Sequence, residues 1–211
     1  MKRLLRIKPF PWFLGLFILL LVGVLQLHVS KPGVEILACP AACAAEAVTP
    51  AGQEILILSL NMLHGYPGFD FLESRVETLI DEIGRLEVDI VLLQEVPWTW
   101  SQGSVAQQFG EQLGFNYAYL RANGNYRLIG FEEGSVILSR YPLANLTFTE
   151  LQPRAGFYEN RVVLHATAET PEGPIDLFVT HLTNGRAAVN EAQAKSLLAF
   201  VQTEAKYPAI V

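Results

Sequence analysis

Two polar side chains at the ends of apolar stretches could together bind a metal ion. Glu95 follows the apolar run Ile90–Leu93, which has the continuous apolar character of a strand buried on both faces. Asn61 ends a second such stretch, Ile55–Leu60. A carboxylate and an amide oxygen are hard-cation ligands, and Mg²⁺ in proteins typically keeps several waters beside one or two carboxylates. The pattern therefore predicts a divalent-cation site with Glu95 and Asn61 as its ligands.

The segment between these two strands should place both side chains at one end of the sheet. Apolar residues recur at three- and four-residue spacing over Leu72–Leu86, which predicts an amphipathic helix with Asp70 and Glu73 forming a capping box. A strand–helix–strand unit makes its two strands parallel, so Asn61 and Glu95 should share a sheet end. A plainer interpretation stays open, in which Glu95 only marks where a strand reaches water.

A histidine occupies a similar position later in the chain. His181 follows the apolar strand Ile175–Val179, and its unperturbed pKa suits proton transfer near neutrality. The alternative is a strand-end histidine satisfied by its structural neighbours. His64, in the loop after Asn61, receives no role because a lone loop histidine usually faces solvent.

The remaining pattern is that of an α/β (α+β) chain whose second half is antiparallel. The strands at 162–168 and 175–180 flank a turn rich in proline and glycine and should form a hairpin. Further elements are expected as helices at 105–113 and 190–206 and as strands at 115–120, 134–139, 146–150 and 207–211. The sheets should therefore be mixed rather than purely parallel.

Five short motifs in a fixed order resemble the endonuclease/exonuclease/phosphatase family, which includes DNase I-like nucleases and inositol polyphosphate phosphatases. The resemblance covers roughly residues 54 to 211 and rests on Ile57–Asn61, Asp89–Glu95, Gly134–Pro142, Asn160–Arg161 and Phe178–Leu182. It implies a DNase I-like two-sheet β-sandwich flanked by helices. It also implies a phosphodiester hydrolase that uses Mg²⁺, with Mn²⁺ as the alternative ion.

The resemblance implies specific roles for the candidate residues. His181 and Asn61 would be catalytic, and the histidine at this position in family members contacts the scissile phosphate. Glu95 and Asn61 would hold the metal. Arg161 and Asn184 would contact substrate phosphate, since a guanidinium fork matches phosphate geometry; a surface ion pair is the alternative for Arg161. The substrate would be a phosphate ester, either nucleic acid or a lipid headgroup, and no protein partner is predicted.

Family members continue beyond the position of Val211 into a Gly-Asp-Phe-Asn motif that supplies an aspartate acting on the attacking water. Residues 54–211 are therefore expected to be the N-terminal two-thirds of the family domain, incomplete at the C-terminus and inactive as a fragment. The alternative function is a noncatalytic, membrane-tethered binding module derived from the same fold.

The N-terminal region has a different composition from the rest of the chain. Lys2, Arg3, Arg6 and Lys8 precede the apolar run Trp12–Leu27, which predicts a membrane-directed helix over residues 1–28. An uncleaved anchor is favoured over a cleaved, secreted form, with the body on the extracytoplasmic side. Residues 29–53 should be a linker, in which lipidation of Cys39 is a further alternative.

Charge and cysteine content limit the function further. All 21 acidic residues follow residue 30, whereas four of the 15 basic residues precede it, so the body is more acidic than the net charge of −6 suggests. Such a body argues against nonspecific binding of nucleic acid through a basic face. The two cysteines, Cys39 and Cys43, lie in the expected linker, so the folded body should contain no disulfide.

Overall fold

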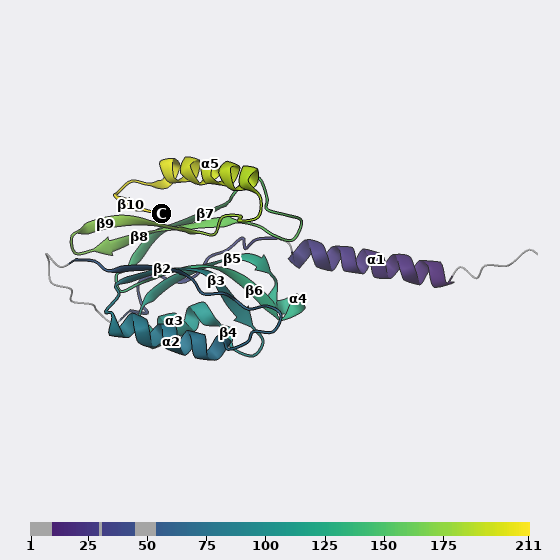
Figure 1. Cartoon of the computed structure of the whole chain (residues 1–211), viewed down its shortest axis with the longest axis horizontal. Coiled ribbons are helices and arrows are strands. Elements are labelled where there is room, and N and C mark those ends of the chain that lie inside the picture. The colour runs from purple at the N-terminus through teal and green to yellow at the C-terminus, as the bar shows by residue number, and fades with distance from the viewer. Residues whose placement is uncertain (1–9, 30, 45–53) are drawn as a thin grey trace, which may run out of the picture.

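The computed structural model describes residues 10–29, 31–44 and 54–211 of the chain. Two β-sheets lie face to face, with helices on their outer faces (Figure 1). This is the two-sheet, mixed α/β arrangement that the sequence predicted.

The first sheet carries the metal-site candidates. Its strand order is β1-β5-β6-β3-β2, with β4 paired to β3. The strands are β1 (Leu37–Cys39), β2 (Ile57–Asn61), β3 (Ile90–Thr99), β4 (Gly103–Ser104), β5 (Asn116–Gly124) and β6 (Phe131–Ser139). Strands β2 and β3 are parallel, joined through α2 (Leu72–Arg85), and Asn61 lies opposite Gln94. The predicted strand–helix–strand unit is confirmed.

The second sheet has four strands in the order β10-β9-β8-β7. They are β7 (Leu143–Glu150), β8 (Val162–Thr170), β9 (Gly173–Thr180) and β10 (Ala209–Ile210). Strands β8 and β9 form the predicted antiparallel hairpin, while β10 pairs with β9 in parallel. His181 directly follows β9, at the end of the sheet that faces the first sheet's candidate residues.

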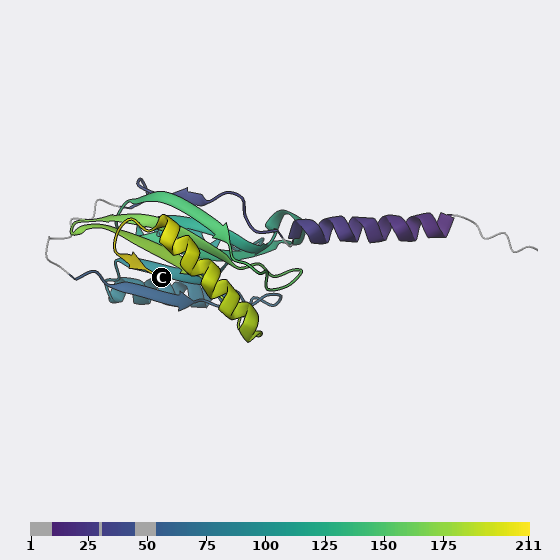
Figure 2. The same ribbon diagram turned by 90° about the horizontal axis from the view of Figure 1, so that it is seen from above.

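Three apolar layers hold the sheets and helices together. One lies between the first sheet and the helices α2 and α3 (Val105–Leu113), where Ile83 and Phe109 are fully buried. The second fills the space between the sheets, with Ile90, Leu120 and Leu164 among its members. The third lies under α5 (Ala187–Glu204), which covers the outer face of the second sheet, as Figures 1 and 2 show. A short helix, α4 (Tyr126–Ile129), precedes β6.

The N-terminal segment is helical, as α1 (Phe10–Val29), and projects away from the two sheets (Figure 1). Among the residues that the structure describes, no helix has the length and apolar character needed to cross a membrane, which leaves the predicted membrane-spanning helix without structural support. The basic residues Lys2, Arg3, Arg6 and Lys8 lie outside the described part of the chain.

Part of the expected linker belongs to the folded body. Leu37–Cys39 form β1 and pair with β5 at the edge of the first sheet. A disulfide joins Cys39 to Cys43, and the side-chain oxygen of Asn116 accepts a hydrogen bond from the backbone N–H of Cys43 at 3.3 Å. The expectation of a body without a disulfide is therefore wrong, because a three-residue strand is too short to be recognised from its sequence. Residues 45–53 lie outside the described residues.

Candidate active site at the strand ends

An irregularity in β3 aims Glu95 into the site. The register between β3 and β6 shifts between Leu93 and Val96, and Glu95 lies in the left-handed region with a φ of 57°. A bulge of this kind changes the direction of a side chain relative to the strand. The neighbouring position on β6 must be glycine, since a Cβ on Gly134 would lie 2.0 Å from the carbonyl oxygen of Leu120.

Asn61 holds the carboxylate of Glu95 in place. Its Nδ2 donates a hydrogen bond to Oε1 of Glu95 at 3.0 Å, and its Oδ1 accepts one from the backbone N–H of Leu63 at 2.9 Å. The two predicted ligands are thus brought together. In this arrangement, however, Asn61 orients the carboxylate, and direct coordination by its oxygen requires the amide to turn.

Two histidines flank the same carboxylate. Nε2 of His64 lies 3.6 Å from Oε2 of Glu95, and Nδ1 of His181 lies 3.6 Å from Oε1. Burial lowers the pKa of both imidazoles below the usual value, so both are neutral near pH 7. Burial opposes ionisation of Glu95, but the Asn61 hydrogen bond and the nearby histidines outweigh it and lower its pKa.

A cavity of about 260 Å³ opens beside Glu95 and His64. Arg161 lines it and is 8% exposed, and its guanidinium forms an ion pair with Glu159. The Nε of Arg161 is buried without a hydrogen-bond partner, so part of its fork is available for a ligand. Asn184 is exposed in the loop after His181 and is not among the residues that line this cavity. The structure therefore groups four of the five predicted site residues.

A further side chain in the cavity wall is an acid that the sequence did not indicate. Glu133 on β6 is 6% exposed, and the side-chain amide of Asn123 donates a hydrogen bond to it. Asn123 is held in turn by Asn160, whose backbone N–H donates to its Oδ1 at 2.7 Å. Burial raises the pKa of Glu133 to about 7.

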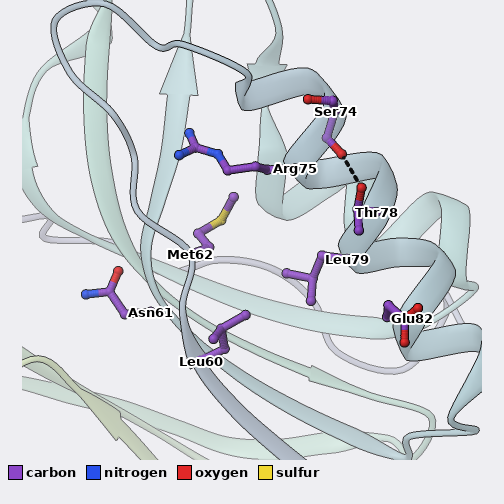
Figure 3. A pocket seen from close by; sticks show the side chains of 8 residues that line it. All are labelled: Leu60, Asn61, Met62, Ser74, Arg75, Thr78, Leu79 and Glu82. Atoms are coloured by element: carbon purple, nitrogen blue, oxygen red, sulfur yellow. Dashed lines mark hydrogen bonds between the residues drawn. The ribbon is translucent and has the colours of Figure 1, made fainter.

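A second cavity, of about 320 Å³, lies on the other side of Asn61, between β2 and α2 (Figure 3). Its wall is mainly apolar, and Leu79 and Arg75 of α2 project toward Leu60 and Met62 (Figure 3). Glu95 and the two histidines do not line this second cavity. The chemistry-bearing residues gather on the first cavity instead.

Sequence reasoning missed His64, Glu133 and Asn123. His64 lies near Glu95 because of the path of the loop after β2, and no periodic sequence pattern predicts that path. Glu133 and Asn123 face the site because β5 and β6 are antiparallel neighbours, with Asn123 opposite Glu133. The sequence signal that pointed to this wall of the cavity was the Asn160–Arg161 motif. Asn160 is fully buried and positions Asn123, which in turn contacts Glu133.

The donor set around Glu95 fits an ion of the magnesium type. One carboxylate, with an amide beside it and room for water in the cavity, is the protein contribution that Mg²⁺ commonly receives. In the described part of the chain, no group of three or more His, Cys, Asp or Glu side chains is arranged to hold a metal. A donor set of this kind is typical of a cation that keeps most of its waters, whereas a closed structural zinc site needs four protein ligands.

Comparison with solved structures shows the same fold. An endonuclease/exonuclease/phosphatase family protein from Leptotrichia buccalis superposes with a TM-score of 0.59 at 13% identity, covering 73% of this chain and 65% of that one. The human Nocturnin catalytic domain with bound sulfate gives 0.53 at 21% identity, covering 74% and 61%. ANGEL2, a 2′,3′-cyclic phosphatase in complex with adenosine-2′,3′-vanadate, gives 0.54 at 21% identity, covering 70% and 47%.

This chain thus spans less than two thirds of each of these solved structures. A search of curated proteins found no match. The model of the Endonuclease/Exonuclease/phosphatase family matches residues 58–206, which include β2, β3, the cavity and His181. With most of its length matched and its two-sheet fold shared, the chain belongs to the endonuclease/exonuclease/phosphatase family, whose members are hydrolases.

Proposed function

We propose that this site hydrolyses phosphodiesters with the help of a divalent cation, Mg²⁺ or Mn²⁺, when the domain is complete. The observation that carries the proposal is the convergence of Asn61, His64 and His181 on the single carboxylate of Glu95. These residues come from β2, its following loop and the end of β9, so a purely structural role gives no reason for their meeting.

Each of these residues would have a separate role in the reaction. Glu95 would hold the metal, and a metal bound there would polarise a phosphoryl oxygen and stabilise developing charge. Asn61 keeps the carboxylate aimed at the cavity. His181 is neutral near pH 7 and can exchange a proton with a group bound at the phosphate. Arg161 would contact a phosphate oxygen, with Asn184 reaching the substrate only if its loop closes over the cavity.

Two relatives support a phosphate-like ligand at this fold. The Nocturnin structure contains sulfate, and ANGEL2 is a cyclic phosphatase bound to a nucleoside vanadate. Members of the family generally use divalent metals, which agrees with the donor set around Glu95. A nucleic acid or a lipid headgroup remains the proposed source of the phosphate ester.

The test is hydrolysis of bis(p-nitrophenyl) phosphate with and without Mg²⁺. Glu95→Gln should reduce the metal-dependent rate about 100-fold, because charge stabilisation at the phosphate is lost. Glu169→Gln is the matched control, since Glu169 is an exposed residue on β8. Unchanged turnover in Glu95→Gln would remove Glu95 from the site.

The same assay distinguishes the alternative function, a noncatalytic binding module. Such a module would bind Mg²⁺ at Glu95 but release no p-nitrophenol, even when the domain is complete. Titration calorimetry with Mg²⁺ on the wild type and Glu95→Gln separates these outcomes. Binding that is lost in the variant, without turnover in the wild type, would favour the module.

We also propose that the body works outside the cytoplasm. The Cys39–Cys43 disulfide supports this, because disulfides persist mainly in oxidising compartments. Protein purified from its native compartment should show no free thiols on titration under denaturing, nonreducing conditions. Two free thiols per chain would contradict this placement.

A further inference from the structure

Two loops of the candidate site carry the side chains that would act at the phosphate. Arg161 ends the segment 151–161 between β7 and β8, the Arg161 loop, and His181 begins the segment 181–186 between β9 and α5, the His181 loop. The ladder of hydrogen bonds between β8 and β9 reaches neither residue. The separation of the two loops is therefore set by contacts outside this ladder.

The side chain of His181 depends on its backbone for its orientation. Its Nδ1 is buried without a hydrogen-bond partner among the described residues, and it lies 3.6 Å from Oε1 of Glu95, beyond ordinary hydrogen-bond distance. Burial lowers the pKa of His181, and the charge of Arg161 lowers it further, so the two loops lie close to each other. A small shift of either loop would change the distance between these two side chains.

Gln193 of α5 connects the two loops through one side-chain amide, which is fully buried. Its Oε1 accepts a hydrogen bond from the backbone N–H of Thr183 at 3.0 Å, in the His181 loop. Its Nε2 donates a hydrogen bond to the backbone oxygen of Pro153 at 2.9 Å, in the Arg161 loop. Buried amides are normally hydrogen-bonded, but here the two bonds of one amide go to two different loops.

Both backbone groups of Thr183 are bound by α5. Asn190, three residues before Gln193 and on the same side of the helix, donates a hydrogen bond through Nδ2 to the carbonyl oxygen of Thr183 at 2.7 Å. Thr183 is itself buried. The His181 loop is thus fixed to the helix two residues after the imidazole.

The contact with Pro153 extends to Arg161 through the next side chain of its loop. Arg154 follows Pro153, and its guanidinium donates a hydrogen bond to the side-chain oxygen of Asn160. Asn160 is fully buried and directly precedes Arg161. The Arg161 loop is thus fixed to the same position of α5 as the His181 loop.

We propose that Gln193 is a positioning residue, whose side-chain amide holds the two loops at the separation at which His181 and Arg161 reach one phosphate. This inference rests on the proposed function for the roles of these two side chains. A glutamine suits the position because its amide offers an acceptor for Thr183 and a donor for Pro153.

Three variants separate these hydrogen bonds from the packing of α5. Gln193→Met keeps the length of the side chain but removes both bonds of the amide. Gln202→Met is its matched control, because Gln202 is exposed on the same helix. Asn190→Ala is a milder change at a half-buried position and removes only the second bond to Thr183.

Amide hydrogen exchange followed by NMR on the full chain tests the connection without requiring turnover. The amide of Thr183 should exchange about tenfold faster in Gln193→Met and about threefold faster in Asn190→Ala, because a hydrogen bond is lost in each. Gln202→Met should exchange as the wild type does, and the amides of β3 should keep their protection in every variant. Unchanged exchange at Thr183 in both Gln193→Met and Asn190→Ala would overturn the inference.

Calorimetric titration with inorganic phosphate in the presence of Mg²⁺ tests the positioning itself. Gln193→Met should bind phosphate about tenfold more weakly, because His181 and Arg161 no longer converge on it. Its affinity for Mg²⁺ should not change, since Asn61 holds Glu95 on the first sheet. Equal phosphate affinity in Gln193→Met and Gln202→Met would contradict the positioning role, as would an equal loss of Mg²⁺ and phosphate binding in Gln193→Met.

Gln193→Glu provides a conservative rescue that depends on pH. A protonated carboxyl at this position can donate to Pro153 and accept from Thr183, whereas an ionised carboxylate can only accept. Its phosphate affinity should therefore match that of the wild type at about pH 5 and be about tenfold weaker than that of the wild type at about pH 8. A ratio to the wild type that does not change with pH would show that the amide acts through packing alone, which would reject the inference.

Failure of this inference differs from failure of the proposed function. Mg²⁺-dependent hydrolysis of bis(p-nitrophenyl) phosphate with equal kcat in the wild type and Gln193→Met would sustain the phosphodiesterase and reject the positioning role. Phosphate binding that depends on Gln193, without hydrolysis by the wild type, would sustain the positioning role and count against the phosphodiesterase.

Discussion

The protonation of Glu133, in the cavity wall, makes the stability of the fold depend on pH. Burial raises its pKa to about 7, and the charged groups that face it are Glu95 from β3 and, from the loop before β8, Arg161 and Glu159. The folded state therefore holds this proton more tightly than the unfolded chain does. Its stabilising contribution is present at low pH and is lost as the pH rises through about 7.

Glu133→Gln should gain stability relative to the wild type as the pH is raised from about 5 to about 8, by on the order of 3 kcal/mol. Urea unfolding in the presence of EDTA at both pH values measures the difference. Glu169→Gln should follow the wild type, and a pH-independent offset for Glu133→Gln would contradict the buried-carboxyl explanation.

Glu159 holds the guanidinium of Arg161, the side chain that we propose contacts phosphate. The two side chains form an ion pair, and that of Glu159 is 48% exposed, so it can swing away. Glu159→Gln should tighten the binding of inorganic phosphate about threefold to tenfold, because a competing anion is removed. Calorimetry with phosphate measures this, with Glu172→Gln as the exposed control. Weaker phosphate binding in Glu159→Gln would show that Glu159 positions Arg161 productively.

The sequence was sufficient to predict the candidate site residues that directly follow apolar strands. Asn61, Glu95 and His181 each follow an apolar strand, and parallel pairing or family order brings such ends together. Glu133 and His64 could not be found in this way. Their approach to the cavity depends on the bulge at Glu95 and on a loop path, which are results of tertiary packing.

Among the elements, β9 is tied to the end of α5 by one buried carboxylate. Oδ2 of Asp176 accepts hydrogen bonds from the backbone N–H groups of Lys206 at 2.7 Å and Tyr207 at 2.9 Å. Its Oδ1 accepts from Thr167 at 2.7 Å and lies 3.1 Å from Nε2 of His165. This explains why His165 is buried on β8, and it fixes the turn that leads into β10.

The hydrogen bonds of Asp176 should act as a clamp that stabilises the fold. Asp176→Ala should lower the free energy of unfolding by about 3 kcal/mol, because it leaves several buried donors without an acceptor. Asp176→Asn should lose less, since it keeps one acceptor oxygen. Urea unfolding compares both with Glu169→Ala on the neighbouring strand, and an Asp176→Ala loss no larger than that of the control would rule the clamp out.

The position at which α2 begins could not be predicted from the sequence. The predicted capping box at Asp70 and Glu73 is wrong, because the N-cap is Phe71, which has a φ of 58° and no side-chain cap hydrogen bond. The loop before the helix contains further left-handed residues, Leu63 and Phe69, so its path shifts the helix start by one residue. The apolar periodicity of the helix itself was sufficient to predict it.

The far end of the first sheet is fixed by the remaining motif residues. Asp89 accepts a hydrogen bond from the backbone N–H of Leu56 at 2.9 Å through Oδ2, and its Oδ1 lies 3.5 Å from Nε of Arg140. These two motif residues therefore join β2, β3 and β6 at the end of the sheet opposite the candidate site. The two-sheet fold was predictable because its motifs include such structural ties, whereas the pairing of the short β1 was not.

Strand β2 forms one edge of the first sheet. In the described part of the chain, β2 pairs with β3 alone, and Leu56 and Leu60 are 47% and 41% exposed. The cavity of Figure 3 hollows one side of this edge, and a cavity of about 400 Å³ lined by Ile57 and Ser59 hollows the side toward the second sheet. Open apolar edges of this kind promote pairing with another strand.

We therefore expect two copies of the chain to associate through β2 as concentration rises. Leu56→Lys, at the residue directly before β2, should shift the equilibrium toward monomer, since a charge beside an edge strand opposes edge-to-edge pairing. Sedimentation velocity over a concentration series measures the shift. Leu128→Lys is the control, because Leu128 is 41% exposed on α4, away from this edge. If Leu128→Lys dissociates the protein and Leu56→Lys does not, association proceeds through another surface and the open β2 edge is not its cause.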